Sequence, residues 1–406
     1  MNINTVIKHL RYIEHKGDYL NLINELKQLI FQDKRILSNH YVKEWCGKRW
    51  RNIFITESLK EPGNVEAANE KKIFGKDTRP DRQKIAVRFL RGDGTDEWSI
   101  EMPEVQSVNL KNSTLLFCPG LLNEIAPVLA FKSAFPEIEK KYDFKVLQSD
   151  SHPARSCDTN GNDILNAMER GLGLDANGNI IDEKDAHFPG DVFIISNNKG
   201  TPDLLHLLVK RPDLKDNIRC IFNYGGMPGG TYLANDIYKS IKDINLSLTD
   251  GLQKLLKVIS PAIQLPEKLR RIQEYDIKNS IYDLTTNRRM EFLNRYLPEI
   301  DSLNIPIFNL SGSTSPMEVP YFQIQGVLEL NKYDSNNDMQ VTQKQAKISS
   351  PMATDLAMLH AHHWDLAYEA FPKNMRLGSP NLEHPFPKLA ILTTIFKFAS
   401  ELGLVD

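Results

Sequence analysis

The sequence predicts an α/β fold in which a mostly parallel sheet carries helices on both faces. Short apolar runs, most of them followed by a turn and a helical stretch, occur at residues 114–118, 145–148, 191–195, 218–223 and 305–310. Strands that alternate with helices form parallel sheets, and strands covered on both faces are apolar along their whole length. The chain has 406 residues, of which 41% are hydrophobic, so it is long enough for one such domain with insertions.

Residues 1–60 are expected to be helical. Apolar side chains at helical spacing form two faces, which contain Val6, Leu10 and Ile13 and, after a break at Gly17-Asp18, Leu22, Leu26, Leu29 and Ile30. Residues 60–83 are rich in Glu, Lys, Asn, Gly and Pro and are typical of an exposed connection. Residues 1–83 are thus an N-terminal helical arm and linker. The arm either packs on the main domain or forms a separate partner-binding hairpin, and the packed arm is favoured because so few residues rarely make a stable core alone.

Residues 84–406 are expected to form the main domain. Its first two strands are predicted at 85–90 and 97–102, as a hairpin or as neighbouring strands, because a Gly- and Asp-rich turn separates the two segments. Residues 231–300 then interrupt the alternation with a long helical block. An insertion at this point of the chain forms either a cap over a cleft or a set of extra packing helices.

The net charge and the cysteines indicate which binding partners and which cellular compartment to expect. The chain carries 50 basic and 52 acidic residues, a formal net charge of −2, which favours neither nucleic acid nor an anionic membrane as a partner. No apolar stretch reaches the roughly 18–20 residues of a membrane span, and the N-terminus lacks the pattern of a signal peptide. Four scattered cysteines without metal-type spacing indicate free thiols. We therefore expect a cytoplasmic protein with no cofactor and no transmembrane segment, although export without a cleaved signal would leave no trace in the sequence.

The segment 191–200 carries the most informative turn of the chain. An apolar strand runs into five positions that match the form G-x-S-x-G and are here Ser196, Asn197, Asn198, Lys199 and Gly200. In this form a sharp turn between a strand and a helix lifts a Ser hydroxyl above the sheet. Pro202 and Asp203 suit the first turn of the helix that follows. Asn198 holds the central position, and its amide cannot attack a carbonyl.

Four other segments stand in order around this turn. They are a strand ending in Pro119-Gly120, a loop at 151–157 that contains His152, a polar loop at 333–341 with Asp334 and Asp338, and the segment 359–364 with three histidines. A strand that ends in Pro-Gly lets the backbone turn sharply, so the next amides can face a developing negative charge.

Together these segments resemble the α/β-hydrolase family over roughly residues 97–406, and in particular a bacterial subgroup whose turn reads Gly-Tyr-Ser-Lys-Gly. The resemblance implies that Asn198 occupies the nucleophile position. It also implies that the backbone N–H groups of Leu121 and Lys199 form the oxyanion hole, which stabilises the charge on a substrate's carbonyl oxygen. Asn198 departs from the subgroup at the residue that must react, and Ser196 departs at the first small position.

The same resemblance assigns the other two members of a catalytic triad. In this family the acid follows a late strand and precedes the His along the chain. Asp338, with Val341 three positions on, matches the family's Asp-x-x-Val form, and Asp334 is the runner-up. His363 occupies the position of the catalytic His, and His362 replaces the Asp of the subgroup's Asp-His-Trp.

Other roles for the histidines are weaker. The three histidines of the segment 359–364 are similar to a metal-binding tract, but no Cys or acidic partner stands nearby at ligand spacing, so no metal is expected. His152 is either a general base or, as we expect, a loop His held by backbone hydrogen bonds.

The resemblance implies a protein of carboxylic-ester hydrolase ancestry, similar to esterases and lipases, that is impaired at Asn198. Such a pseudoenzyme would bind a small acyl or lipid-like molecule, or a protein partner through the N-terminal arm. The alternative is an active serine- or cysteine-type ester or acyl hydrolase with another nucleophile, such as Cys118, Ser151 or a serine within 311–315. Two further alternatives are an engineered Asn198 and deamidation of Asn198 to a nucleophilic Asp, although Asn198-Lys199 is not the fast Asn-Gly pair.

Overall fold

The computed structural model describes residues 3–69, 77–106, 108, 110, 113–121, 129–245, 247–252, 269–369 and 385–405. Within these residues one sheet contains β1 (Leu90–Arg91), β2 (Thr114–Cys118), β3 (Lys145–Gln148), β4 (Val192–Asn198), β5 (Ile218–Gly226), β6 (Ile307–Ser313) and β7 (Ala353–His360). Their order is β1-β7-β6-β5-β4-β2-β3, and every neighbouring pair is parallel except β1 and β7. The predicted fold class is confirmed, and β2 to β6 form at the predicted apolar runs.

The two strands predicted at 85–90 and 97–102 are wrong. Asp81–Phe89 form helix α5, and its buried residues are Lys84, Ile85, Ala86 and Phe89. This spacing covers one face of a helix, and a short apolar run alone does not distinguish a buried helix from a strand. β1 is a two-residue edge strand, and the 3-10 helix η2 (Gly92–Ser99) follows it.

Helices cover both faces of the sheet. On one face α3 (His40–Leu59), α5, α6 (Ala134–Tyr142) and α16 (Lys388–Glu401) share a core with Leu115, Phe117, Phe193 and Phe222. On the other face α7 (Cys157–Arg170), α8 (Gly200–Lys210) and α12 (Thr286–Ser302) pack on Leu116, Ile194 and Ile221. Because neighbouring residues of a strand point to opposite faces, strands that are apolar throughout serve both cores.

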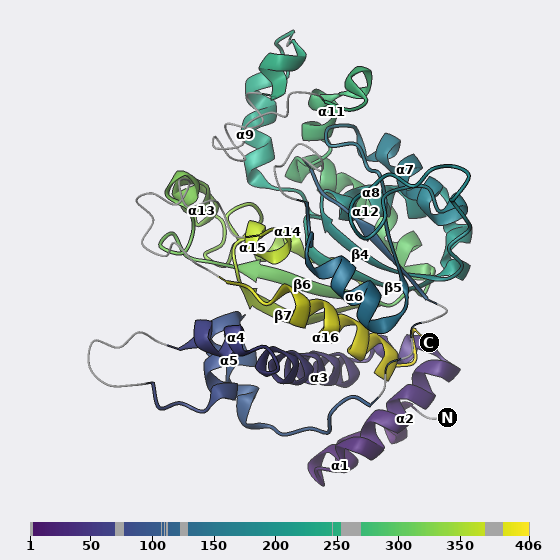
Figure 1. Ribbon diagram of the computed structural model, residues 1–406, viewed down its shortest axis with the longest axis vertical. Coiled ribbons are helices and arrows are strands. Elements are labelled where there is room, and N and C mark those ends of the chain that lie inside the picture. The colour runs from purple at the N-terminus through teal and green to yellow at the C-terminus, as the bar shows by residue number, and fades with distance from the viewer. Residues whose placement is uncertain are drawn as a thin grey trace.

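The N-terminal helices belong to the same core as the sheet. They are α1 (Ile3–His15), α2 (Tyr19–Gln32), η1 (Lys34–Ser38), α3 and α4 (Pro62–Ala68). α3 lies along α16 (Figure 1) and buries Trp50 and Phe54, whose rings stack 5.5 Å apart. The buried Arg49 of α3 donates to both carboxylate oxygens of Glu401 in α16, at 2.7 and 2.5 Å. α3 is therefore a core helix, joined to the C-terminal helix by a two-point ion pair.

The exposed connection predicted at 60–83 is partly wrong. α4 forms within it and buries Asn64 and Ala68, while residues 70–76 lie outside the described residues. Pro62 occupies the first turn of α4, where the missing N–H costs no hydrogen bond. Pro and Gly at this point are typical of a loop but here begin a helix. A division of the chain at residue 83 stays a prediction.

The insertion predicted at 231–300 is helical where it is described. It contains α9 (Tyr232–Ile241), η4 (Ile272–Glu274), α11 (Ile277–Tyr282) and α12, and residues 253–268 lie outside the described residues. α9 and α11 contact each other and lie at the end of the molecule opposite α1 and α2 (Figure 1). α12 instead packs on α8 in the second core. One part of the insertion is thus free to cover a site, and the other part is a packing helix.

A row of polar side chains crosses the apolar sheet, and we call it the polar ladder. It consists of Ser196, Asn223, Asn309 and Asp355, which stand opposite one another on β4, β5, β6 and β7. Asn223 donates to Asn309 and Asn309 donates to Asp355, each at 2.8 Å. Thr201 joins the first two members, because its hydroxyl lies 2.8 Å from that of Ser196 and 3.0 Å from the amide oxygen of Asn223.

The polar ladder also holds the chain between β6 and β7. This stretch contains η5 (Tyr321–Gln323), α13 (Ile324–Leu330) and α14 (Gln343–Ala346). Two short helices lie elsewhere in the chain: α15 (His363–Ala367) follows β7, and η3 (Pro212–Asn217) precedes β5. The amide of Asn223 donates to the carbonyl of Ala346 at 2.8 Å, and that of Asn309 donates to the carbonyl of Ile348 at 3.0 Å. The end of α14 and the loop that follows it are thereby anchored to the sheet.

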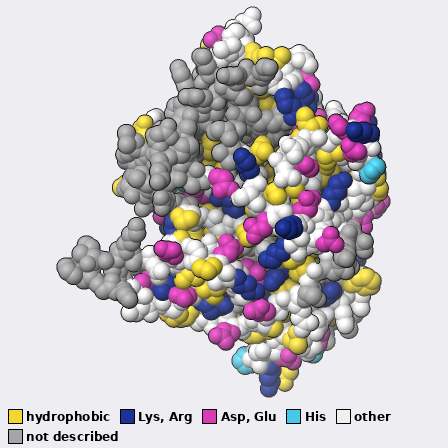
Figure 2. Space-filling model, viewed as in Figure 1, with side chains coloured by type: hydrophobic (Ala, Val, Ile, Leu, Met, Phe, Trp, Pro, Cys, Tyr) yellow, Lys and Arg dark blue, Asp and Glu magenta, His cyan; other side chains and the backbone are white. Residues whose placement is uncertain are grey.

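Figure 2 shows basic and acidic side chains mixed over the described part of one face of the molecule. Apolar side chains lie between these charged side chains. Among the described residues, no helix is both long and apolar enough to cross a membrane.

Candidate active site

The turn after β4 has the strained backbone of a nucleophile elbow. Asn198 has φ +50°, a left-handed conformation that is uncommon for residues other than Gly. α8 begins two residues later at Gly200. A Cβ at Gly200 would lie 2.2 Å from the carbonyl oxygen of Cys118, so the turn approaches β2 more closely than any side chain allows. The glycine at the last position of the G-x-S-x-G form is therefore required for steric reasons.

The side-chain amide of Asn198 makes three hydrogen bonds and is 7% exposed. Its oxygen Oδ1 accepts from the backbone N–H of Leu121 at 3.1 Å and from that of Lys199 at 2.6 Å. Its nitrogen Nδ2 lies 2.6 Å from Nε2 of His363. The two N–H donors require an acceptor, so they fix which end of the amide is oxygen. Asn198 therefore places its own carbonyl oxygen between the two backbone amides to which the family resemblance assigns the role of an oxyanion hole.

His363 connects Asn198 to a buried carboxylate. Its Nδ1 lies 2.7 Å from Oδ2 of Asp338, which is fully buried. The other oxygen of Asp338 accepts from the backbone N–H groups of Gln340 and Val341, at 3.0 and 2.8 Å. With Nδ1–H donating to the carboxylate, Nε2 is left as the acceptor for the Asn198 amide. The structure thus brings Asn198, His363 and Asp338 into one hydrogen-bonded chain.

The other polar residues predicted near this site have different partners. Asp334 accepts from the backbone N–H of Asn336 at 2.9 Å, as a turn former does, and it does not reach His363. His362 is the N-cap of α15 and accepts from the N–H of Asp365 at 3.1 Å. This capping is a role that Asp commonly fills. Within the described residues, no group of three His, Cys, Asp or Glu side chains could hold a metal.

A buried ion pair lies beneath the elbow, and sequence reasoning missed it. The ammonium group of Lys199 is 2.5 Å from Oδ1 of Asp203, and both side chains are 1% exposed. The second oxygen of Asp203 accepts from the amide of Asn160 in α7 at 2.9 Å. Burial is the largest single effect and lowers the pKa of Lys199, but the charge and hydrogen bond of Asp203, together with other nearby groups, outweigh it and raise the pKa above the usual value. The available signal was the four-residue spacing between Lys199, which precedes α8, and Asp203 in its first turn.

A narrow and mostly apolar cavity opens beside Asn198. About 40 Å³ of it admits the centres of water molecules. It is lined by Leu121, Asn198, Met227, Thr231, Leu233, Ala234, Ile237, Ile281, Leu284, Gln323 and Gln340. α9 and α11 supply Leu233, Ala234, Ile237 and Ile281, so this part of the insertion forms one wall of the cavity.

His152 lies in a cluster of ion pairs and not beside Asn198. Its Nδ1 accepts from the N–H of Ala154 at 3.1 Å, and its Nε2 lies 3.3 Å from the carbonyl of Arg271. Burial, followed by the charges of Arg271 and Arg155, lowers the pKa of His152 to about 4. Arg155 also pairs with Glu274 of η4. His152 is therefore a structural His, as expected, in a cluster that joins the loop after β3 to the insertion.

The alternative nucleophiles have other partners. Cys118 is fully buried, and burial raises the pKa of its thiol. The hydroxyl of Ser151 lies 2.8 Å from that of Ser149, and the hydroxyl of Ser311 donates to Gln343 at 2.6 Å. Within the described part of the chain, none of them pairs with His363.

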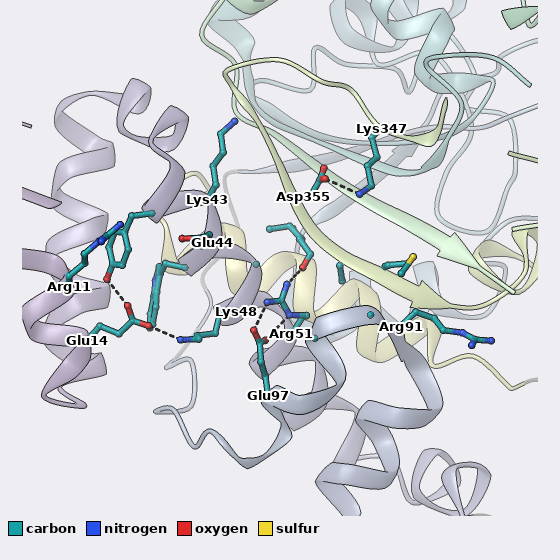
Figure 3. Close-up of a pocket in the computed structure, with 18 residues that line it drawn as sticks. Arg11, Glu14, Lys43, Glu44, Lys48, Arg51, Arg91, Glu97, Lys347 and Asp355 are labelled. Atoms are coloured by element: carbon teal, nitrogen blue, oxygen red, sulfur yellow. Dashed lines mark hydrogen bonds and ion pairs between the residues drawn. The ribbon is translucent and has the colours of Figure 1, made fainter. Parts of the chain in front are cut away.

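A larger groove, of about 970 Å³, lies away from Asn198, between α3 and the edge of the sheet at β7 and β1 (Figure 3). Six of its charged side chains form three ion pairs across or along it. Lys48 lies 2.8 Å from Glu14, Arg51 lies 2.6 Å from Glu97, and Lys347 lies 2.9 Å from Asp355. None of the five residues assigned to the candidate site lines this groove.

The α/β-hydrolase fold has a mostly parallel sheet, an elbow after one central strand, and an acid and a His on later loops. This chain has that fold, with the acid on the loop before β7 and the His on the loop after it. The solved structure of the metagenomic carboxyl esterase MGS0156 is similar to it, with a TM-score of 0.61 and 20% sequence identity over 87% of this chain and 91% of that one.

Two structures of the Bacillus licheniformis lipase BlEst2 are similar over shorter stretches. The mature form has a TM-score of 0.44 and 19% identity over 65% of this chain and 90% of its own, and the propeptide form has a TM-score of 0.41 and 17% identity over 66% and 48%. Neither the sequence models of known families nor the curated proteins contain a match to this chain.

Proposed function

We propose that this protein is a pseudoenzyme of ester-hydrolase ancestry, which keeps an acyl or lipid-like binding cavity and lacks the attacking atom. The observation that carries the proposal is the position of the Asn198 amide. Its oxygen accepts from both backbone N–H groups of the proposed oxyanion hole, and its nitrogen donates to His363. In the proposed roles Asp338 is the triad acid, His363 is the base, and Asn198 stands at the nucleophile position.

The chemistry of an amide explains why turnover should be low. The nitrogen lone pair of Asn198 is delocalised into its carbonyl, so it is not a useful nucleophile at neutral pH. A substrate ester would also have to displace the Asn198 oxygen before it could use the two N–H donors. A site that keeps its oxyanion hole but lacks a triad member retains about 10³–10⁴-fold acceleration over water, and here even the hole is filled.

The lining of the cavity supports an apolar ligand. Leu233, Ala234 and Ile237 of α9 line the same narrow cavity as Asn198, together with Met227 and Leu284. An acyl chain would bury apolar surface there without an ion pair, at about 25 cal/mol per Å². The hydroxyl of Thr231 is already engaged, because it donates to the carbonyl of Gln340 at 2.5 Å.

The decisive experiment compares hydrolysis of p-nitrophenyl butyrate by the natural protein and by Asn198→Ser. We expect little turnover by the natural protein and a large gain in Asn198→Ser that His363→Ala removes. Asn197→Ser is the matched control, because Asn197 is its buried neighbour but donates to the carbonyl of Tyr224. Vigorous hydrolysis by the natural protein that depends on His363 would contradict the proposal.

A fluorophosphonate probe separates this proposal from an enzyme with another nucleophile. We expect no labelled residue in the natural protein and labelling at position 198 in Asn198→Ser. Stoichiometric labelling of Ser151, or of a serine within 311–315, would instead identify a working nucleophile. Partner binding through α1 and α2 stays a prediction.

A further inference from the structure

We propose that Asn198 is itself a modification site, at which the surrounding groups hydrolyse the side-chain amide to a carboxylate. The side-chain amide of Asn198 lies among these groups as the amide of a bound substrate would lie in an active site. This inference goes beyond the proposed function, because it needs no external ligand and no ester turnover.

The amide of Asn198 is polarised at its oxygen, and its nitrogen contacts the imidazole of His363. Two N–H groups, from Leu121 and Lys199, contact Oδ1, where negative charge develops when the carbonyl carbon is attacked. Donors aimed at such an oxygen contribute on the order of 10²–10³ in rate each. Nε2 of His363 lies 2.6 Å from Nδ2, which is the leaving group of an amide. Asp338 holds the imidazole in this orientation.

Water is the co-reactant, and the cavity has room for it. The roughly 40 Å³ open beside Asn198 exceeds the ~10–15 Å³ that one water needs. The water oxygen forms a bond to the carbonyl carbon Cγ, and one of its protons passes to Nε2 of His363. His363 then gives that proton to Nδ2, the Cγ–Nδ2 bond breaks, and ammonia leaves. The second water proton remains on the new acid, which ionises, so the net reaction converts an amide and water into a carboxylate and an ammonium ion.

The same geometry disfavours the common route of deamidation. That route requires the backbone nitrogen of Lys199 to attack Cγ and form a cyclic imide, which opens to a mixture of aspartate and isoaspartate. Here the N–H of Lys199 points at Oδ1 at 2.6 Å, and a donor in this position lies close to the plane of the amide. Attack on Cγ comes from above or below that plane. Direct hydrolysis should therefore produce aspartate alone.

The chain contains its own reference sites. Asn177 is exposed and precedes Gly178, so it reports the imide route in the same sample. Asn197 is buried beside Asn198, but its amide donates to the carbonyl of Tyr224 and does not contact His363. It controls for burial and for neighbouring sequence.

The test is incubation of the purified full-length protein at neutral pH in water labelled with heavy oxygen, followed by peptide mass spectrometry that distinguishes aspartate from isoaspartate. We expect aspartate with one heavy oxygen at position 198, an intact Asn197, and both isomers at position 177. The formal net charge then changes from −2 to −3, which isoelectric focusing resolves.

Variants separate the role of His363 from the stability of the fold. His363→Gln keeps a hydrogen-bonding side chain but cannot shuttle the proton, so conversion at position 198 should slow by about 10²-fold or more while conversion at Asn177 is unchanged. Asp338→Asn should slow it as well. Thermal unfolding of each variant excludes the loss of the fold as the cause.

Three outcomes would overturn the inference. They are an intact Asn198 in a sample whose Asn177 has converted, isoaspartate at position 198, and an unchanged rate in His363→Gln. The readout is independent of ester hydrolysis, so the failure of this inference and the failure of the proposed function are distinguishable. Ester turnover should be measured on protein whose Asn198 is shown by mass to be intact.

Discussion

A Cβ placed on Gly120 would lie 2.3 Å from the Cβ of Asn198. The segment that follows β2 and the elbow that follows β4 therefore lie in direct contact. The glycine lets the N–H of Leu121 reach the Asn198 oxygen. The two segments are 77 residues apart along the chain. Their approach is a steric condition of the site.

Gly120→Ala should therefore displace the elbow. We expect a loss of about 1–3 kcal/mol in the free energy of unfolding, the usual cost of overpacking, measured by urea denaturation. In the Asn198→Ser background the same change should also lower ester turnover. Gly63→Ala is the control, because a Cβ there meets no atom within 4 Å in α4. It should be neutral or slightly stabilising, and equal effects of the two changes would contradict the steric argument.

The buried pair of Lys199 and Asp203 should be costly to break. Lys199→Met leaves the carboxylate of Asp203 buried with the uncharged side chains of Asn160 and Cys157 as partners, and we expect a loss of about 3–5 kcal/mol in the free energy of unfolding. Lys332→Met removes an exposed pair with Glu329 and should cost less than about 1 kcal/mol.

A double variant tests the same pair from the other side. Lys199→Met combined with Asp203→Leu removes both charges, so it should recover much of the stability that Lys199→Met alone loses. If Lys199→Met unfolds at the same urea concentration as Lys332→Met, the pair contributes nothing and this account is wrong.

His152 should make the fold less stable as the pH falls. Its pKa is lowered from 6.5 to about 4 by burial and by the charges of Arg271 and Arg155. Above pH 6.5 the imidazole is neutral in both the folded and the unfolded chain. Between pH 6.5 and 4 the unfolded chain takes up a proton that the folded site excludes, so stability present above pH 6.5 is lost, by roughly 1–3 kcal/mol.

The variant His152→Asn keeps an acceptor near the N–H of Ala154 and does not titrate, so denaturation midpoints should fall less steeply between pH 6.5 and 4. Burial also lowers the pKa of His206 to about 4, so part of the slope should remain. His40→Gln, at an exposed His, should leave the profile as it is. An identical profile in His152→Asn would count against this assignment.

The wall formed by α9 should select the length of the acyl chain. Ala234→Phe fills the cavity and, in the Asn198→Ser background, should raise KM for p-nitrophenyl octanoate more than for p-nitrophenyl acetate. Lys239→Phe adds the same ring to an exposed position of the same helix and should have little effect. Equal changes of KM for both esters in Ala234→Phe would argue against an acyl site here.

Much of the fold followed from local pattern. The runs that became β2 to β6 are buried on both faces, and continuous apolar runs bounded by turns report this environment directly. α5 was misread because its apolar run is only as long as a strand. α4 was missed because Pro and Gly, which usually mark loops, stand in its first turn.

The residues of the candidate site could be predicted from the sequence, but the orientation of the Asn198 side chain could not. The order of Asn198, Asp338 and His363 is written in the sequence, and so is the turn that presents Asn198. The direction of the Asn198 amide depends on Leu121 and His363, which lie 77 and 165 residues away. No local pattern reports a side-chain rotamer that distant backbone groups select.

The polar ladder has a consequence for how the sheet assembles. A strand that is apolar throughout keeps its inward and outward faces when it slides by two residues, so hydrophobic burial alone discriminates poorly between such alignments. The amides of Asn223 and Asn309 satisfy their partners only in the native alignment, and misplaced they would be buried without hydrogen bonds. The hydrogen bonds of these few polar atoms therefore favour the native register of the strands over shifted registers. Because the elbow lies at the end of β4, its position also depends on this register.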